Sequence, residues 1–359
     1  MIRAILLLVC CQAALSFDSS SFSKQAQVPG QNQNQNQNQN SPQQQAASRA
    51  SANIAAMVRN RTNSWTAGAP RQPLSSYRVG VNMEELESKR LKPGILILKE
   101  DIDLPEQFDA RDKWPQCSSL REVRNQGCCG SCWAISAAEA FTDRWCIHSP
   151  EHTTFSFGSF DLISCCHSCG DGCQGGVLGP AWDYWVQKGV SSGGPYNSKQ
   201  GCHSYPFDTC HSPDEDDDAP KCSRKCQSSY SVQDVSKDRR FGRVAYSVVA
   251  DEHRIMEEIF VNGPVQAAFQ VYLDFKTYKS GVYRHVTGPL EGGHAIKILG
   301  WGVENGTKYW LCSNSWGEDW GDHGFFKIVR GENHLGIESD VHAGLPHYRK
   351  HKEMFEYDY

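Results

Sequence analysis

Cys132, His294 and Asn314 are residues whose types suit covalent catalysis at a carbonyl carbon. A cysteine thiolate is the nucleophile, a histidine takes and returns the proton, and an amide orients the imidazole. Cys132 opens an apolar run that continues over Trp133–Phe141 and predicts a buried helix with Ser131 near its N-cap. A cysteine at a helix N-terminus gains a lower pKa from the helix dipole. We therefore expect Cys132 to be a reactive thiol.

Two other interpretations of Cys132 compete with this one. The string CGSC also fits a C-x-x-C redox motif, but such motifs follow a strand in a βαβ pattern, whereas a turn-rich segment precedes this one. An ordinary disulfide is the default for a cysteine in a secreted chain. His294 follows two glycines at the start of an apolar strand, and Asn314 stands near Trp316. The presence of these two partner residues favours the interpretation of Cys132 as a catalytic nucleophile over the other two.

The N-terminus has the pattern of a secretory signal peptide over residues 1–16, with a basic Arg3 and a short apolar core. No later segment reaches about 18 apolar residues, so we expect no membrane span. The signal contains Cys10 and Cys11, which leaves 14 of the 16 cysteines for an oxidising compartment. With an even number, a catalytic free thiol requires at least one more unpaired cysteine.

Composition divides the remaining chain into four parts. They are a low-complexity segment (17–50), an accessory segment (51–103), a cysteine-rich body (104–346) and a tail (347–359). The Gln/Asn repeat of the first segment predicts a flexible tether. The accessory segment contains a helix-like charged stretch at 83–92 and a short strand that begins at Ile95. In the body, helical patterns precede strand-rich patterns, which predicts two subdomains with a cleft between them.

Seven motifs together resemble one enzyme family. They are LPEQFDARDKWPQC, NQGCCGSCWA, DRWCIH, CGDGCQGG, SGVYRHVTG, GGHAIKILGWGVENGTKYWL and NHLGIESDVHAG. From about Ser64 to Pro346 the chain resembles the cathepsin B-like proenzymes of the papain family of cysteine peptidases, whose signature includes CGSCW. The resemblance implies an α+β, papain-like fold with a helical half, a β-barrel-like half and an active-site cleft between them. It implies no cofactor and no metal.

The resemblance also implies roles for the motif residues. Cys132 is the nucleophile, His294 its general base, and Asn314 orients the imidazole. The Gln126 side-chain amide completes an oxyanion hole with the Cys132 backbone N–H, and Trp316 covers the histidine–asparagine hydrogen bond. His294 and Asn314 lie 162 and 182 residues after Cys132. Papain-type spacings are about 130–150 residues, so an insertion is required, and the cysteine-rich segment 195–230 supplies it.

Three residues are implied as substrate contacts. Gly175 and Gly176 lack a Cβ and so let the substrate backbone approach, although paired glycines also indicate an ordinary turn. Asp340 stands where the family has an acidic residue at the floor of the pocket for the second side chain before the cut. There it would pair with arginine, whereas the alternative is a solvated surface acid.

Five disulfides follow from the same resemblance, namely Cys117–Cys146, Cys129–Cys173, Cys165–Cys222, Cys166–Cys169 and Cys202–Cys226. Cys128, Cys210 and Cys312 remain besides the catalytic thiol. We expect Cys312 to be a small buried hydrophobe, and Cys128 and Cys210 to be unpaired thiols open to reaction. The string CCHSCGDGC is also compatible with a zinc site, but a secreted chain favours disulfides.

The chain departs from the family in the loop Cys202–Cys226. The family's occluding loop has two adjacent histidines that bind the C-terminal carboxylate of a substrate, and this loop has no such pair. An acidic run, Asp214–Asp218, stands there instead and would repel a carboxylate. We therefore expect an endopeptidase whose carboxydipeptidase activity is weakened or absent.

The accessory segment is expected to be a propeptide that blocks the cleft and is removed just before Leu104. The expected partners are peptide substrates, this propeptide as inhibitor, and cystatin-type inhibitors, with the enzyme a monomer. The small net charge of −5 argues against nucleic-acid or anionic-membrane binding. Sequons at Asn60 and Asn305 permit glycosylation. We expect a lysosomal or extracellular location, including a gut lumen.

An inactive cathepsin B-like binding or matrix protein is the main alternative function. The presence of Cys132, His294, Asn314 and Gln126 favours the enzyme.

Overall fold

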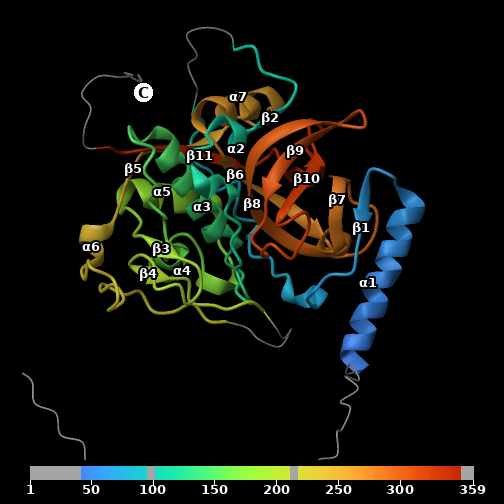
Figure 1. Cartoon of the computed structure of the whole chain (residues 1–359), viewed down its shortest axis with the longest axis horizontal. Coiled ribbons are helices and arrows are strands. Elements are labelled where there is room, and N and C mark those ends of the chain that lie inside the picture. Colours follow the sequence, from blue (N-terminus) through green and yellow to red (C-terminus); the bar gives the residue numbers. More distant parts are fainter. Residues whose placement is uncertain (1–41, 95–101, 211–216, 349–359) are drawn as a thin grey trace, which may run out of the picture. The chain divides into compact units, whose positions relative to one another are not determined.

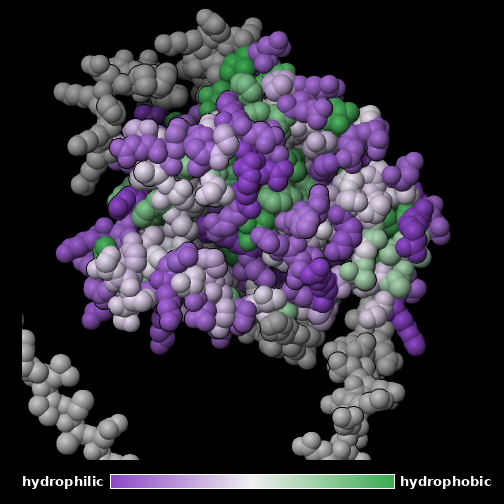
Figure 2. Space-filling model, viewed as in Figure 1, coloured by the Kyte–Doolittle hydropathy of each residue, from purple (hydrophilic) through white to green (hydrophobic). Residues whose placement is uncertain are grey.

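The computed structural model describes residues 42–94, 102–210 and 217–348. The signal peptide, the Gln/Asn repeat, residues 214–216 of the acidic run and the last part of the tail lie outside the described residues. Most of the strand expected from Ile95 lies there too. Within the described residues, no helix is both long enough and apolar enough to cross a membrane. The face seen in Figure 2 is mainly hydrophilic.

The strand-rich half forms one nine-stranded sheet, drawn in orange and red in Figure 1 for most of its strands. The order is β1-β7-β10-β9-β8-β6-β11-β5, and β2 pairs with β8 beside this path. The pair β10–β7 is parallel and the other pairs are antiparallel. The strands are β1 Trp65–Ala67, β2 Phe108–Asp109, β5 Gly242–Val248, β6 Val265–Tyr272, β7 Tyr278–Tyr283, β8 Leu290–Glu304, β9 Thr307–Ser313, β10 Phe325–Val329 and β11 Val341–Pro346.

The helical half is built around one buried helix, α3 (Cys132–His148). Its residues from Cys132 to Ile147 are all buried, as an apolar pattern all round the helix predicts. Aromatic rings pack against it, and the rings of Phe141 and Trp185 stack with centroids 4.4 Å apart. The other elements are α2 Ala110–Lys113, α4 Ser159–Cys165, α5 Leu178–Gln187, α6 Val235–Asp238, α7 Glu252–Asn262 and a two-stranded sheet of β3 Gly193–Gly194 and β4 His203–Ser204.

Buried polar contacts join the two halves. The Lys297 ammonium of β8 lies 2.8 Å from the Asp143 carboxylate of α3, and both side chains are fully buried. The Gln266 amide of β6 donates to the Trp133 carbonyl at 2.7 Å. These contacts fix the start of α3 against β6 and its second half against β8. The expected α+β architecture with a helical and a strand-rich half is therefore confirmed.

The accessory segment differs from expectation in two respects. Helix α1 (Pro42–Arg61) crosses the boundary that composition places between residues 50 and 51. The stretch 83–92 forms turns and not a helix, although Glu85 and Lys89 do make an i,i+4 ion pair. The residue just before this stretch is hydrogen-bonded to the body, since Asn82 donates its backbone N–H to the Gly176 carbonyl. Tertiary contacts therefore override the local helix pattern.

The structure forms all five expected disulfides and a sixth, Cys128–Cys210. The expectation that these two cysteines are unpaired is wrong, because the fold brings their Cα atoms to 4.7 Å. Cys132 and Cys312 are the free cysteines among the described residues, and both are buried. Cys312 packs in the hydrophobic core of the sheet. The cysteines of CCHSCGDGC are all in disulfides, and no cluster of metal-binding side chains occurs among the described residues.

Candidate active site

Strand pairing brings His294 and Asn314 together. His294 lies on β8, and Asn314 directly follows β9, which pairs with β8 through Lys297 and Ser313. The His294 Nε2 and the Asn314 Oδ1 are 2.7 Å apart, and both residues are buried. The Trp316 ring lies over the imidazole, with ring centroids 4.7 Å apart. The indole therefore shields this hydrogen bond from water.

Cys132 stands at the first position of α3, and Ser131 is the N-cap residue. The Ser131 hydroxyl does not cap the helix but hydrogen-bonds the Tyr205 hydroxyl at 2.7 Å. Backbone N–H groups of Ala295 and Gly80 reach the Cys132 thiol. Because Ala295 follows His294 on β8, the thiol lies beside the strand that carries the imidazole.

Burial favours the neutral forms of both reactive groups. It raises the pKa of the Cys132 thiol to about 12, even though backbone N–H groups act in the opposite direction. It also lowers the pKa of His294 to about 4, against the effect of the hydrogen bond that the imidazole donates to the Asn314 Oδ1. Burial therefore acts against the thiolate that the helix dipole favours, and Gly80 of the accessory segment lies at the thiol.

Gln126 is fully buried between the body and the accessory segment. Its side-chain amide Nε2 donates to the Cys129 carbonyl at 2.8 Å and to the Arg78 carbonyl at 3.3 Å. The Trp316 indole donates to the same Arg78 carbonyl at 2.9 Å. A carbonyl oxygen of the accessory segment is thus bound at this end of the cleft by the Gln126 amide, which the sequence singled out as a donor, and by the Trp316 indole, which it did not.

The accessory segment crosses the site as an extended chain. Gly176 donates its N–H to the Gly80 carbonyl and accepts from Asn82, each at 3.0 Å. Gly80 and Val81 both donate to the Gly293 carbonyl on the other side, at 3.0 and 2.9 Å. A Cβ on Gly176 would lie 2.6 Å from the Trp133 ring, so glycine is required there. Gly175 has a φ of +124°.

Asp340 is buried, which excludes the alternative of a solvated surface acid. Its Oδ1 accepts from the Arg90 Nε of the accessory segment at 3.1 Å. The His342 Nε2 lies 3.3 Å from the same oxygen. An arginine therefore already reaches this carboxylate.

Two residues that the sequence analysis missed hold Gln126. The Ser315 hydroxyl donates to its Oε1 at 2.6 Å, and the Tyr205 hydroxyl donates to its backbone carbonyl at 2.8 Å. Ser315 stands between Asn314 and Trp316, so its position in NSW was an available signal. No sequence pattern connects Tyr205 to Gln126.

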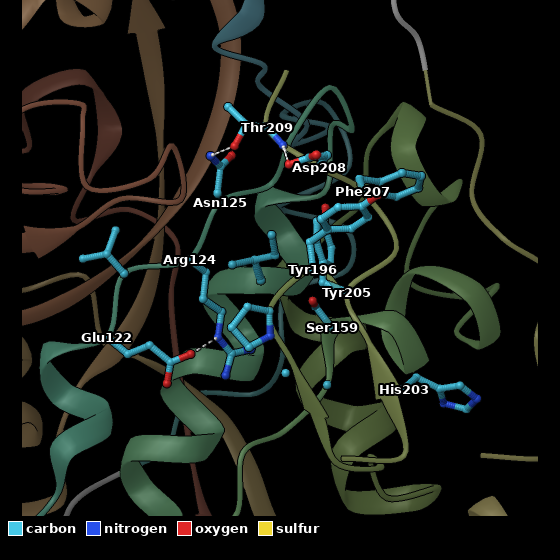
Figure 3. Close-up of a pocket in the computed structure, with 15 residues that line it drawn as sticks. Glu122, Arg124, Asn125, Ser159, Tyr196, His203, Tyr205, Phe207, Asp208 and Thr209 are labelled. Carbon is cyan, nitrogen blue, oxygen red and sulfur yellow. Dashed lines mark hydrogen bonds and ion pairs between the residues drawn. The ribbon is translucent and has the colours of Figure 1, made fainter. Parts of the chain in front are cut away.

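A pocket opens beside the site rather than at it (Figure 3). It is lined by two segments that lie far apart in the sequence, 122–125 and 203–209, together with residues such as Ile135 and Tyr196. Neither Cys132 nor His294 lines it. The accessory segment occupies the space next to those two residues.

Comparisons with known proteins agree on one family. Residues 104–345 match the family model described as papain family cysteine protease. A cathepsin B-like cysteine proteinase of Schistosoma japonicum is 47% identical over 277 residues, which cover 74% of this chain and 81% of that protein. Cathepsin B-like cysteine proteinase 6 of Caenorhabditis elegans is 42% identical, covering 82% of this chain and 86% of that protein.

Solved structures of proenzymes have a similar fold. A procathepsin B of Trypanosoma congolense superposes with a TM-score of 0.72 at 34% identity, covering 84% of this chain and 98% of that one. The proform of the ragweed pollen cysteine protease Amb a 11 gives 0.67 at 21% identity, covering 86% and 88%. Because both are proforms, the fold including the accessory segment is that of a zymogen.

Proposed function

Because this chain belongs to the papain family of cysteine proteases, with cathepsin B-like relatives, we propose that it hydrolyses internal peptide bonds through the Cys132 thiol. The observation that supports this most is the hydrogen bond of 2.7 Å between His294 on β8 and Asn314, which directly follows β9. The chain is a cathepsin B-like cysteine protease with a zymogen-like fold, and the proposal concerns its mechanism and specificity.

In the proposed mechanism, the Cys132 thiol gives its proton to His294 once the propeptide has left. The thiolate attacks the peptide carbonyl, and the oxyanion is stabilised by the Gln126 amide and the Cys132 N–H. His294 protonates the departing amine, which leaves a thioester. His294 then takes a proton from water, and attack by this water releases the acid and restores the thiol. Asn314 holds the imidazole ring throughout.

The accessory segment is the proposed propeptide, with cleavage just before Leu104. It lies across Gly176 and Gly293 through backbone hydrogen bonds, as a substrate would. It also covers the thiol through Gly80. Autoinhibition follows because no peptide can pair with Gly176 while this segment is bound.

We further propose an endopeptidase that accepts arginine at the second position before the cut. The contact between Arg90 and Asp340 supports this, because the carboxylate is buried and already takes a guanidinium. Asp214–Asp218 would repel a substrate carboxylate, although most of this run lies outside the described residues. Carboxydipeptidase activity is therefore proposed to be weak.

The six disulfides fit a protein of the secretory pathway. A lysosomal or extracellular location, a monomeric state and inhibition by cystatin-type proteins are proposals. Glycosylation at Asn60 and Asn305 is proposed because both residues are exposed.

The test expresses the full chain, allows it to mature, and measures hydrolysis of internally quenched peptides and of peptides cleaved only at a C-terminal dipeptide. We expect cleavage of the first set under reducing, mildly acidic conditions, and its loss in Cys132→Ala. Efficient release of C-terminal dipeptides would refute the proposal that carboxydipeptidase activity is weak. Absence of any hydrolysis, together with no labelling of Cys132 by an epoxide, would favour the inactive binding protein.

A further inference from the structure

The sixth disulfide connects the inserted loop to the turn before the nucleophile. Cys210 lies in the loop Cys202–Cys226, and Cys128 lies two residues after Gln126. Both cysteines are buried, with exposed fractions of 1% and 4%. The disulfide therefore links two residues that are 82 positions apart in the sequence, and one of them lies beside Gln126, the proposed oxyanion donor.

Tyr205 attaches the other end of the same loop segment to the same turn. Its hydroxyl donates to the Gln126 backbone carbonyl at 2.8 Å and lies 2.7 Å from the Ser131 hydroxyl. We call the Cys128–Cys210 disulfide together with Tyr205 the loop clamp. The two attachments lie on either side of segment 206–209, so this segment cannot separate from the turn while the loop clamp is intact.

The segment between the attachments is packed closely on the turn. The Asn125 amide donates to the Thr209 hydroxyl at 3.2 Å, as Figure 3 shows. Gly127 has a φ of +62°, and the Asp208 carbonyl occupies the space where a Cβ would lie. Glycine is therefore required at 127 for the loop to come this close.

These contacts lie at one end of the cleft. Asp340 and Gly176 mark the end where Arg90 and Asn82 of the propeptide bind. Gln126 and Trp316 mark the other end, where the Arg78 carbonyl binds. The segment held by the loop clamp packs on residues 125–128, so it forms a wall beside Gln126 and away from Asp340.

We propose that the loop clamp positions Gln126 for catalysis, so that Cys128, Cys210 and Tyr205 are positioning residues of the reaction. The proposal rests on the proposed role of Gln126 in binding the oxyanion. The physical reason is that a side-chain amide stabilises the oxyanion only if its backbone is fixed, and Tyr205 bonds that backbone directly. A disulfide two residues away prevents the turn from shifting.

The test compares the matured wild type with Cys128→Ser/Cys210→Ser. We expect kcat for a peptide substrate to fall about tenfold, while the rate of Cys132 alkylation by iodoacetamide stays within twofold. Alkylation needs the thiolate but makes no oxyanion, so this difference separates positioning of Gln126 from general damage. Equal falls in both rates, or no fall in kcat, would overturn the proposal.

A double-mutant cycle tests whether the effect passes through Gln126. In Gln126→Ala, which we expect to lower kcat by about 10²-fold, adding the two serine substitutions should change kcat by less than twofold. A further tenfold fall would contradict the proposal. The matched control is Cys165→Ser/Cys222→Ser, which removes a disulfide of comparable separation, 57 residues, and should leave kcat unchanged.

Tyr205→Phe keeps the disulfide and the ring but removes the hydroxyl donor. Tyr205→Phe should also lower kcat while the rate of Cys132 alkylation stays unchanged. This variant tests the proposal even if the double serine variant does not fold. An unchanged kcat in Tyr205→Phe would also overturn the proposal. If Gln126→Ala itself retains full kcat, then the proposed role of Gln126 is wrong, which is a separate outcome.

Discussion

Cys132 and His294 are both fully buried in this form of the chain, and Gly80 of the propeptide lies at the Cys132 thiol. Burial penalises whichever form carries charge, so it raises the pKa of a thiol and lowers that of an imidazole. The two effects act together against a thiolate–imidazolium pair. The propeptide can therefore suppress reactivity through solvation as well as by blocking access.

Alkylation of Cys132 is expected to differ between the proenzyme and the matured enzyme. With the thiol pKa at about 12, the proenzyme should react with iodoacetamide very slowly at pH 6 and faster only as the solution becomes strongly alkaline. Removal of the propeptide exposes the site, which lowers the thiol pKa and raises that of His294. We expect at least a 100-fold faster reaction of the matured form at pH 6, measured by mass spectrometry of the labelled peptide.

Cys312 is an internal control for this measurement. It is a free thiol on β9, buried in the hydrophobic core of the sheet. It should remain unlabelled in both forms. Equal labelling of Cys132 in the two forms would contradict the account given above.

Asp340 is expected to set the preference for arginine at the second position before the cut. In Asp340→Ala, kcat/KM for a peptide with arginine there should fall at least tenfold relative to one with phenylalanine, because the buried partner charge is lost. Asp340→Asn keeps the size of the side chain and should behave similarly. If the ratio of kcat/KM between the arginine and phenylalanine peptides is unchanged, then a residue other than Asp340 binds the substrate arginine.

The propeptide segment at the active site binds mainly through its backbone. Gly80 and Val81 pair with Gly293, while the Gly80 carbonyl and the Asn82 N–H pair with Gly176. Gly80 must approach closely, because a Cβ built there would collide with the Gly130 carbonyl. An extended chain with a glycine at the thiol therefore fits the cleft.

Gly80→Ala should weaken autoinhibition. The added methyl group meets rigid backbone, so the segment must lift from the site, and we expect the unprocessed chain to show at least tenfold more peptidase activity than wild type. Activity is measured with cleavage before Leu104 monitored by gel. The matched control is Gly68→Ala, also in the propeptide, whose added methyl meets only the flexible Lys279 side chain. If Gly80→Ala has the same activity as wild type, then backbone pairing elsewhere in the propeptide is sufficient for autoinhibition.

At the scale of the whole molecule, buried charges join the helical half to the sheet. Glu139 of α3 is buried, and neither of its carboxylate oxygens has a hydrogen-bond partner among the described residues. Burial raises the pKa of Glu139 to about 7, although the nearby Lys297 acts in the opposite direction. The folded chain therefore binds a proton here more tightly than the unfolded chain does.

Stability should consequently fall as pH rises. A carboxyl whose pKa is raised from 4.5 to about 7 stabilises the fold fully below pH 4.5, and this contribution of about 3 kcal/mol is lost by the time pH exceeds 7. Glu139→Gln removes the titration, so its Tm should decline less than that of wild type between pH 5 and 7.5. If the Tm of wild type and of Glu139→Gln decline equally over this pH range, then the loss of stability does not come from Glu139.

Local patterns predicted much of the fold. The apolar run after Cys132 predicted helix α3, and the apolar strands around His294 and Asn314 predicted β8 and β9. The helix expected at 83–92 was wrong, because charge spacing describes only neighbours along the chain. There, contacts with the body decide the conformation.

The sequence by itself singled out the proposed reactive residues, since Cys132, His294, Asn314 and Gln126 stand in specific motifs, and parity required that a free Cys132 leave at least one other cysteine unpaired. Only the tertiary structure decided that Cys128 pairs with Cys210, that Arg90 reaches Asp340, and that burial raises the pKa of Cys132 and lowers that of His294. The physical reason is that disulfide pairing, ion pairing and burial depend on distances between segments far apart in the chain, which residue types and local spacing do not contain.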